Sequence, residues 1–252
     1  MNSIWLWSIA SVGIISAISL VGVFLLSLNK ERMRSLLVFL VSLAIGALFG
    51  DALLHLIPES FSLLGDGIAA PLLVLVGIIL FFVLEKLIRW RHCHAQTPEH
   101  YHPVVTMNIV GDALHNFLDG IIIAAAYFAS IPLGVATTLA VILHEIPQEI
   151  GDFGILVHGG LSTKKALLFN FLSACFAMVG ALLFLLVGSH IRGMEIILLP
   201  IIAGGFIYIA GSDLVPELND THTCDTLSSL SLRQLFFILL GISIMVLLTY
   251  VG

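Results

Sequence analysis

Charged residues are scarce in this sequence. Only 10% of its 252 residues are Asp, Glu, Lys or Arg, whereas soluble domains average about 25%. Hydrophobic residues make up 59% of the chain, and the mean hydropathy is +1.12. Too few polar side chains remain to cover a water-facing surface. This composition excludes a soluble globular domain and predicts a membrane protein that crosses the bilayer several times.

Cysteine and clustered basic residues are also scarce. The three cysteines, Cys93, Cys175 and Cys224, cannot form a disulfide framework, and Cys175 lies in an apolar segment where it is expected to pack. The ten Lys and Arg residues are scattered in small groups with no basic stripe. Nucleic acid is therefore excluded as a partner.

Long apolar runs dominate what remains. A helix needs about 20 mostly apolar residues to cross a bilayer. The N-terminal run lacks a basic n-region and is too long for a signal peptide, so it is expected to be a retained first span. Because the connections are short, one all-α transmembrane domain over residues 1–252 is predicted. Its eight spans are 4–28, 35–57, 68–88, 104–129, 132–158, 165–188, 195–216 and 232–251.

Basic residues in the loops predict the orientation of this bundle. With the N-terminus outside, nine of the ten Lys and Arg residues fall on the cytoplasmic side, and only Arg192 lies outside. This bias follows the positive-inside rule and places both termini on the extracytoplasmic side. The membrane expected is the plasma membrane. The nine are Lys30, Arg32, Arg34, Lys86, Arg89, Arg91, Lys164, Lys165 and Arg233.

Two segments resemble each other at an offset of 158 residues: GALFGDALLHLIPE at 46–59 in span two and GGFIYIAGSDLVPE at 204–217 in span seven. The two spans run in opposite directions. Spans 1–3 and spans 6–8 are therefore predicted to form inverted repeats. The offset pairs Gly46 with Gly204, His55 with Asp213, Pro58 with Pro216 and Glu59 with Glu217.

Spans four and five repeat each other at an offset of 29 residues. This offset lays His115, Asn116 and Asp119 on His144, Glu145 and Gln148. These spans also run in opposite directions, so the repeat is inverted again. Inverted repeats with polar groups at mid-membrane are typical of secondary transporters.

Polar side chains gather on one face of each of these two helices. In span four they occupy an arc of about 100°, and in span five an arc of about 140°. Imidazole with carboxylate suits zinc, and accepts iron, manganese or cobalt less selectively. Hydrogen bonding between helices is the alternative for any one of these residues. The residues are Asp112, His115, Asn116 and Asp119, followed by His144, Glu145, Gln148, Glu149 and Asp152.

Pro147 lies inside this second cluster. It removes a backbone N–H and leaves the carbonyl of Leu143 without its helical partner, so a kink is predicted there. Irregular backbone at membrane depth is tolerated where it lines a cavity. A kink that serves packing alone is the other interpretation.

Further acids extend the two clusters into a route through the membrane. His55 and Glu59 fall at the outer end of span two, while Asp112 and Asp152 lie on the cytoplasmic side of the central cluster. Asp213 and Glu217 fall at the inner end of span seven. Asn170 in span six is a weaker candidate ligand. The Pro-Glu pairs at 58–59 and 216–217 are alternatively simple helix ends.

The cytoplasmic loop at residues 89–103 is rich in potential metal ligands. We expect it to bind metal weakly, and a solvated linker is the alternative. A fainter cluster of Asp220, His222, Cys224 and Asp225 follows span seven. The ligands of the first loop are His92, Cys93, His94, His100 and His102.

Four motifs of this chain resemble those of the ZIP (Zrt/Irt-like) family of divalent metal transporters. They are HNFLDG at 115–120, HEIPQE at 144–149 and the two segments related by the offset of 158 residues. The resemblance covers essentially the whole chain. It implies zinc uptake towards the cytoplasm through spans four and five, with Cd²⁺, Fe²⁺, Mn²⁺ and Co²⁺ as further substrates. The lipid bilayer and a second copy of the chain, as a homodimer, are the other partners considered. By motif match the central site, of one or two metals, comprises His115, Asn116, Asp119, His144, Glu145 and Gln148, with Glu149 beside it.

Gln148 departs from the family pattern, because many relatives have histidine there. This departure leaves the site's affinity and its preference for zinc open. An intramembrane zinc protease is the chief alternative, since HEIPQ at 144–148 nearly matches HExxH. Gln148 replaces the second zinc histidine that the protease requires, and Pro147 interrupts the helical turn between the two ligands. The motifs also occur in the opposite order, so a transporter rather than an enzyme is predicted.

Overall fold

The computed structural model describes residues 2–21, 30–93, 102–191, 193–220 and 227–250. Within these ranges the chain is helical and has no β-strand, so the predicted all-α fold is confirmed. Six helices are long and apolar enough to cross a membrane, and two shorter apolar helices, Ile196–Ser212 and Leu232–Leu248, fall in the seventh and eighth predicted spans.

Most of the predicted spans correspond to one helix or to consecutive helical segments. The first span is described as far as Val21, and the rest of its predicted range lies outside the described residues. The seventh continues to Asp220. The elements are α1 (Asn2–Ile18), η1 (Ser19–Val21), α3 (Lys30–Asp51), η2 (Ala52–Leu56), α4 (Ile57–Leu64), α5 (Ala69–Cys93), α6 (His102–Ala129), α7 (Ile131–His158), α8 (Thr163–Ala174), α9 (Phe176–Leu186), η3 (Gly188–His190), α10 (Met194–Tyr208), η4 (Ile209–Leu214), α11 (Val215–Asp220) and α12 (Leu227–Leu248).

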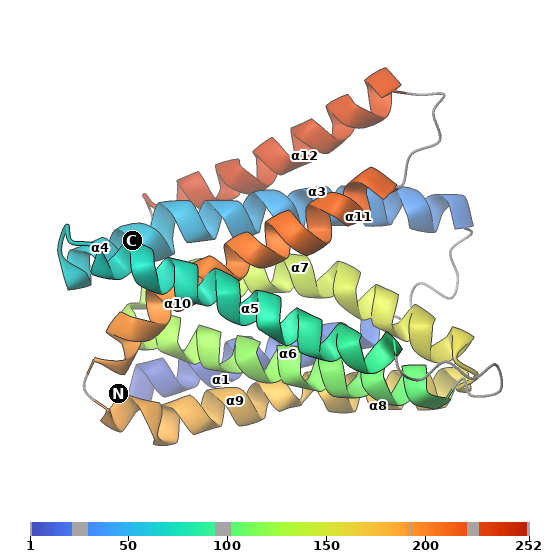
Figure 1. Cartoon of the computed structure of the whole chain (residues 1–252), viewed down its shortest axis with the longest axis horizontal. Coiled ribbons are helices and arrows are strands. Elements are labelled where there is room, and N and C mark those ends of the chain that lie inside the picture. The colour runs from blue at the N-terminus through green and yellow to red at the C-terminus, as the bar shows by residue number, and fades with distance from the viewer. Residues whose placement is uncertain (1, 22–29, 94–101, 192, 221–226, 251–252) are drawn as a thin grey trace.

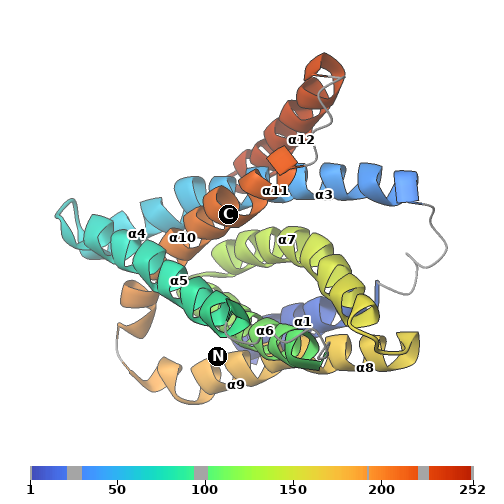
Figure 2. The ribbon, with the colours of Figure 1, turned by 45° about the vertical axis from the view of Figure 1, so that its right-hand side comes forward.

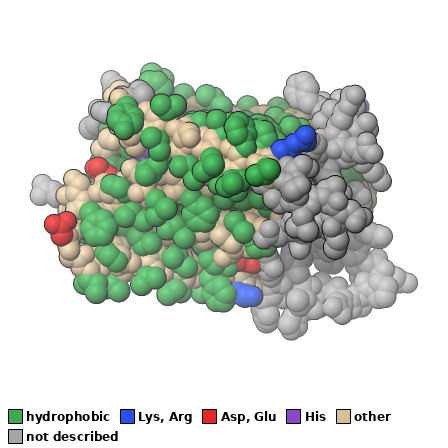
Figure 3. All heavy atoms as spheres, turned by 90° about the horizontal axis from the view of Figure 1, so that it is seen from above, with side chains coloured by type: hydrophobic (Ala, Val, Ile, Leu, Met, Phe, Trp, Pro, Cys, Tyr) green, Lys and Arg blue, Asp and Glu red, His purple; other side chains and the backbone are tan. Residues whose placement is uncertain are grey.

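The helices run side by side along the long axis of the molecule (Figure 1). Helix α1 begins and α12 ends at the same end of the bundle, as expected when the chain crosses an even number of times. On the face seen in Figure 3, hydrophobic side chains cover most of the described surface, while the few charged side chains lie towards its two edges. This distribution suits a protein whose middle faces lipid tails.

The helices fall into two groups by their contacts. Helices α1, α6, α7, α8 and α9 pack mainly on one another, and we call them the first group. The second group consists of α3, α4, α5, α10, α11 and α12. The largest contact between the groups joins α3 to α7. Spans one, four, five and six thus form one group, and spans two, three, seven and eight form the other.

Glycines let helices of the second group meet backbone to backbone. A Cβ at Gly46 would overlap the carbonyl of Ile238 on α12, and a Cβ at Gly204 would overlap the carbonyl of Val74 on α5. Gly46 and Gly204 are equivalent at the offset of 158 residues. Small residues allow this close approach in membrane proteins. The two helix crossings therefore follow the inverted repeat that the sequence predicts.

Both repeats also contain a π-helical segment at matching positions. These segments are η2, at Ala52–Leu56, and η4, at Ile209–Leu214. Each lies just before a proline, Pro58 or Pro216, which cannot donate a backbone hydrogen bond. The helix continues beyond each proline, to Leu64 and to Asp220 respectively. The interpretation of the Pro-Glu pairs as simple helix ends is therefore wrong. The π-helical turn before each proline accommodates the missing backbone donor, so the helix continues.

Candidate metal centre

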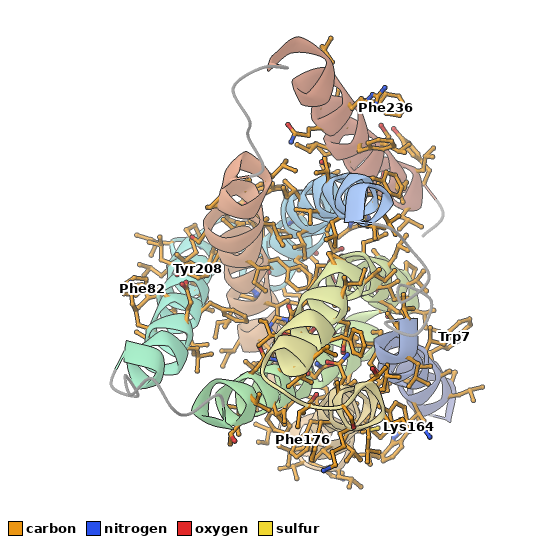
Figure 4. All side chains as sticks on the ribbon, turned by 90° about the vertical axis from the view of Figure 1, so that its right-hand side faces the viewer. Trp7, Phe82, Lys164, Phe176, Tyr208 and Phe236 are labelled. Carbon is orange, nitrogen blue, oxygen red and sulfur yellow. The ribbon has the colours of Figure 1, made fainter. Side chains whose placement is uncertain are left out.

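Helices α6 and α7 form an antiparallel pair inside the bundle. They are joined through Ser130, whose hydroxyl caps α7 by accepting a hydrogen bond of 3.3 Å from the Leu133 N–H. Pro132 in the first turn of α7 suits a helix start. Viewed along the bundle, nitrogen and oxygen atoms gather between α6, α7 and α10, while Trp7, Phe82, Phe176 and Phe236 lie on the outer side (Figure 4).

Four side chains of this pair converge on one point. His115 and Asp119 lie one turn apart on α6, and His144 and Glu145 are neighbours on α7. One ligand atom from each lies within 4.8 Å of all the others. Asp119, His144 and Glu145 are at most 1% exposed, so water contributes little to their solvation. The predicted convergence of the two motifs on a common interior is thus seen for these four residues.

The individual distances show how tightly the four groups face one another. His115 Nε2 lies 3.2 Å from a carboxylate oxygen of Glu145 and 3.7 Å from one of Asp119. His144 Nε2 lies 3.3 Å from the same Asp119 oxygen and 3.6 Å from the same Glu145 oxygen. The two Nε2 atoms are 3.4 Å apart. Two imidazoles and two carboxylates suit a tetrahedral ion such as zinc.

A backbone contact sets the orientation of one imidazole. His144 Nδ1 lies 3.1 Å from the carbonyl oxygen of Ala140. Because a carbonyl only accepts hydrogen bonds, Nδ1 carries the proton and the Nε2 lone pair is directed into the cluster. Metal-binding histidines are commonly held in this way. The Asp119 oxygen that faces the histidines and both Glu145 oxygens accept no hydrogen bond of good geometry. The imidazole nitrogens lie 3.2–3.7 Å from the Asp119 oxygen and one Glu145 oxygen, an arrangement that suits a shared cation.

Pro147 lies inside α7, which remains one helix from Ile131 to His158. Figure 2 shows that α7 curves along its length over α6 and α1. Prolines within helices are a common cause of such bends. This curved helix carries His144 and Glu145, and a local kink at Pro147 stays a prediction.

Other predicted residues of the central site are placed differently. Asn116 is buried and donates to an Asp112 oxygen at 2.8 Å. Glu149 accepts a hydrogen bond from Asn170 of α8, so Asn170 contacts an acid and is not among the four converging side chains. Gln148 is half-buried on α7, one turn beyond His144. The roles of Asn116, Gln148 and Glu149 as ligands remain predictions.

Sequence reasoning did not single out Asp51. This carboxylate on α3 is fully buried, and His55 Nδ1 lies 3.2 Å from one of its oxygens. The hydroxyl of Thr137 on α7 is a further neighbour, so Asp51 lies where the two helix groups meet. The sequence did contain a signal. Asp51 and His55 are four residues apart, which is the same spacing as in the pair of His115 and Asp119. Glu59 lies further along, half-buried on α4.

Replacing Asp51 with asparagine is expected to separate stability from transport. The change keeps the shape of the side chain and removes only its carboxylate, so we expect the melting temperature in detergent to change by no more than about 2 °C. Metal uptake should fall by about tenfold, because a cation then loses a carboxylate beside His55. The exposed Asp66 provides the matched control, Asp66→Asn, which should change neither quantity. Unchanged uptake in Asp51→Asn would remove Asp51 from the route.

Several predicted residues lie outside the described part of the structure. They are His94 and His100, together with the side chains of His92, Cys93, His102, Asp213 and Glu217.

The fold and the buried cluster define a class: an all-α membrane protein with several spans and a buried His/carboxylate cluster whose ligand atoms are close enough to hold a metal ion. A family model described as ZIP Zinc transporter matches residues 2–103 and 91–249. The chain belongs to this family, as the motifs predict. Its members transport divalent metal ions and are not enzymes, so the protease alternative is wrong.

Curated relatives match most of the chain. Metal cation symporter ZIP14 of Xenopus tropicalis is 31% identical over 98% of this chain and 70% of its own length. Metal cation symporter ZIP8 of Homo sapiens is 31% identical over 87% of this chain and 64% of its own length. Zinc transporter YKE4 of Saccharomyces cerevisiae is 31% identical over 89% and 75%. The chain therefore spans about two thirds to three quarters of the length of these relatives.

Proposed function

We propose that the chain carries divalent metal ions, zinc foremost, across the plasma membrane towards the cytoplasm. The observation that carries this proposal is the convergence of His115, Asp119, His144 and Glu145 within 4.8 Å at a buried position. Relatives named as zinc transporters and as metal cation symporters support the substrate class. The basic loops support an orientation of the chain with both termini outside.

The route begins at His55, Asp51 and Glu59 on the second helix group. Metal sheds part of its water there and then reaches the central cluster on α6 and α7. It leaves past Asp112 and Asp152 towards Asp213 and Glu217. Because the imidazoles must be neutral and the carboxylates ionised to bind metal, binding weakens as the pH falls.

Movement of one helix group against the other explains how metal passes without an open pore. The four converging ligands all belong to the first group, whereas Asp51 and His55 belong to the second. Close backbone contacts at glycines hold the helices together within each group. Gly120 lies at such a contact in the first group, and Gly46 lies at one in the second. Sliding at the contact between α3 and α7 exposes the centre first to one side of the membrane and then to the other.

Reconstitution in liposomes tests the proposal. The full chain is placed in vesicles that contain a metal-sensitive dye, and zinc, cadmium, iron and manganese are added outside in separate experiments. We expect saturable uptake of at least one metal, with zinc preferred, and faster uptake at pH 7 than at pH 5. Vesicles without protein are the control. Uptake no faster than in these vesicles, for all four metals, would contradict the proposal.

A further inference from the structure

An aromatic residue of the second helix group packs against one histidine of the cluster. The ring of Phe206, on α10, lies 6.1 Å from the imidazole of His144, measured between ring centroids, and the two planes meet at 68°. Phe206 is fully buried, and His144 is 1% exposed. Edge-to-face contacts between rings are favourable and directional, so this contact restrains the orientation of the His144 imidazole.

The cluster is closed on the side where Phe206 lies. His115 also packs edge-to-face on His144, with a centroid distance of 5.6 Å and an angle of 89°. The side chain of His115 is 20% exposed, whereas that of His144 is 1% exposed. The cluster is therefore open at His115 and closed at His144, where the second helix group covers it.

The packing of α10 on α5 holds Phe206 against the first helix group. A Cβ at Gly204 of α10 would overlap the carbonyl of Val74 on α5, so the two backbones already touch there. Phe206 follows Gly204 by two residues, which is about 200° around the helix, and so it points away from α5. Helix α10 cannot withdraw Phe206 from His144 by moving towards α5.

The orientation of His144 therefore depends on both helix groups. Within the first group, the Ala140 carbonyl holds the proton on Nδ1. From the second group, Phe206 restrains the ring, so that Nε2 stays directed at the oxygens of Asp119 and Glu145. The four converging ligands all belong to the first group. Movement of the second group past them would remove the restraint without removing a ligand.

We propose that Phe206 is a positioning residue of the metal centre and makes zinc affinity depend on the relative position of the two helix groups. While Phe206 packs on His144, the imidazole is held ready for the ion and zinc binds tightly. When the groups slide and this contact is lost, the His144 ring gains rotational freedom, and zinc is released more easily. By linkage, bound zinc favours the position in which Phe206 meets His144. This role rests on the proposed function and deepens it, because it connects sliding to affinity.

Zinc titration of the purified full chain in detergent tests this role. Phe206→Leu stays apolar but removes the ring, and we expect it to weaken zinc binding by about threefold to tenfold, the equivalent of one aromatic pair. Phe206→Met, which is also apolar and more adaptable, should have the same effect. The matched control is Phe184→Leu on α9, because Phe184 packs edge-to-face on Phe128 at 5.9 Å within the first group. It should bind zinc like the wild type.

A double-mutant cycle separates the positioning of His144 from a general loss of packing. In the His144→Ala background, Phe206→Leu should cause no further loss of zinc affinity. The absorption spectrum of bound Co²⁺, which reports the geometry of the ligands, should change in Phe206→Leu and stay unchanged in Phe184→Leu. Thermal unfolding in detergent shows that each variant is folded.

The positioning role is overturned if Phe206→Leu and Phe206→Met bind zinc as tightly as Phe184→Leu does. It is also overturned if Phe206→Leu weakens binding equally in the presence and absence of His144, because the ring would then act on the fold as a whole. If the ring of Phe206 affects zinc binding in a protein that gives no uptake in liposomes, only the proposed function is contradicted.

Discussion

Replacing Gly120 with valine is expected to destabilise the helix bundle strongly. A Cβ at Gly120 of α6 would overlap the carbonyl of Ala177 on α9, and a Cβ at Gly180 would overlap the carbonyl of Phe117 on α6. Backbone atoms cannot rotate aside as a side chain can, so α6 and α9 must separate. We expect a cost at the upper end of overpacking penalties, about 3 kcal/mol, and a fall in melting temperature of about 6 °C or more.

Size-exclusion chromatography and thermal unfolding in detergent measure this effect. Gly13→Val on α1 is the matched control, because a Cβ at Gly13 would meet nothing within 4 Å. Gly180→Val should behave like Gly120→Val, since the two glycines form one reciprocal contact. A folded Gly120→Val variant with the melting temperature of Gly13→Val would show that the close crossing of α6 and α9 is not required.

Replacing His144 with alanine is expected to weaken zinc binding by at least about 100-fold. Loss of an outer hydrogen-bond partner of a ligand typically costs 10–100-fold, and loss of the ligand itself should cost at least as much. His144 is 1% exposed and its Nε2 is 3.3 Å from Asp119, so water cannot easily replace it without rearrangement. The change leaves two carboxylates facing each other beside His115 alone.

Isothermal titration of the purified protein with zinc measures this loss. His190→Ala is a suitable control, because His190 is exposed on η3 at the end of α9. We expect it to bind zinc like the wild type. Zinc affinity of His144→Ala within about threefold of the wild type would place the high-affinity site elsewhere on the chain.

Hydrophobic runs and motif spacing predicted much of the architecture. Apolar runs fix where helices can cross, and the offset of 158 residues paired Pro58 with Pro216, each of which the structure places just after a π-helical segment. The same offset paired Gly46 with Gly204, and the structure shows that both glycines lie at equivalent helix crossings. The π-helical geometry itself was not predicted, because a proline in a helix is compatible with a kink, an end or a wider turn.

The central cluster was predicted only in part. Helical periodicity placed His115 and Asp119 on one face of α6. It predicted Asn116 as a ligand equally, whereas the Asn116 amide donates a hydrogen bond to Asp112. Contacts between helices decide such cases, and spacing within one helix does not report them. Asp51 was overlooked for a related reason. Its importance depends on burial against Thr137 of α7, and burial between distant spans is not visible along a single segment.

The most direct test of the account is zinc uptake by liposomes that contain an internal zinc dye, with the wild type compared with His115→Ala and Asp119→Ala. Both residues belong to the four-ligand cluster, so we predict uptake at the level of empty liposomes for each variant. Asp66→Ala, which alters an exposed acid outside the cluster, should transport like the wild type. Uptake that survives both His115→Ala and Asp119→Ala would contradict passage of metal through this centre.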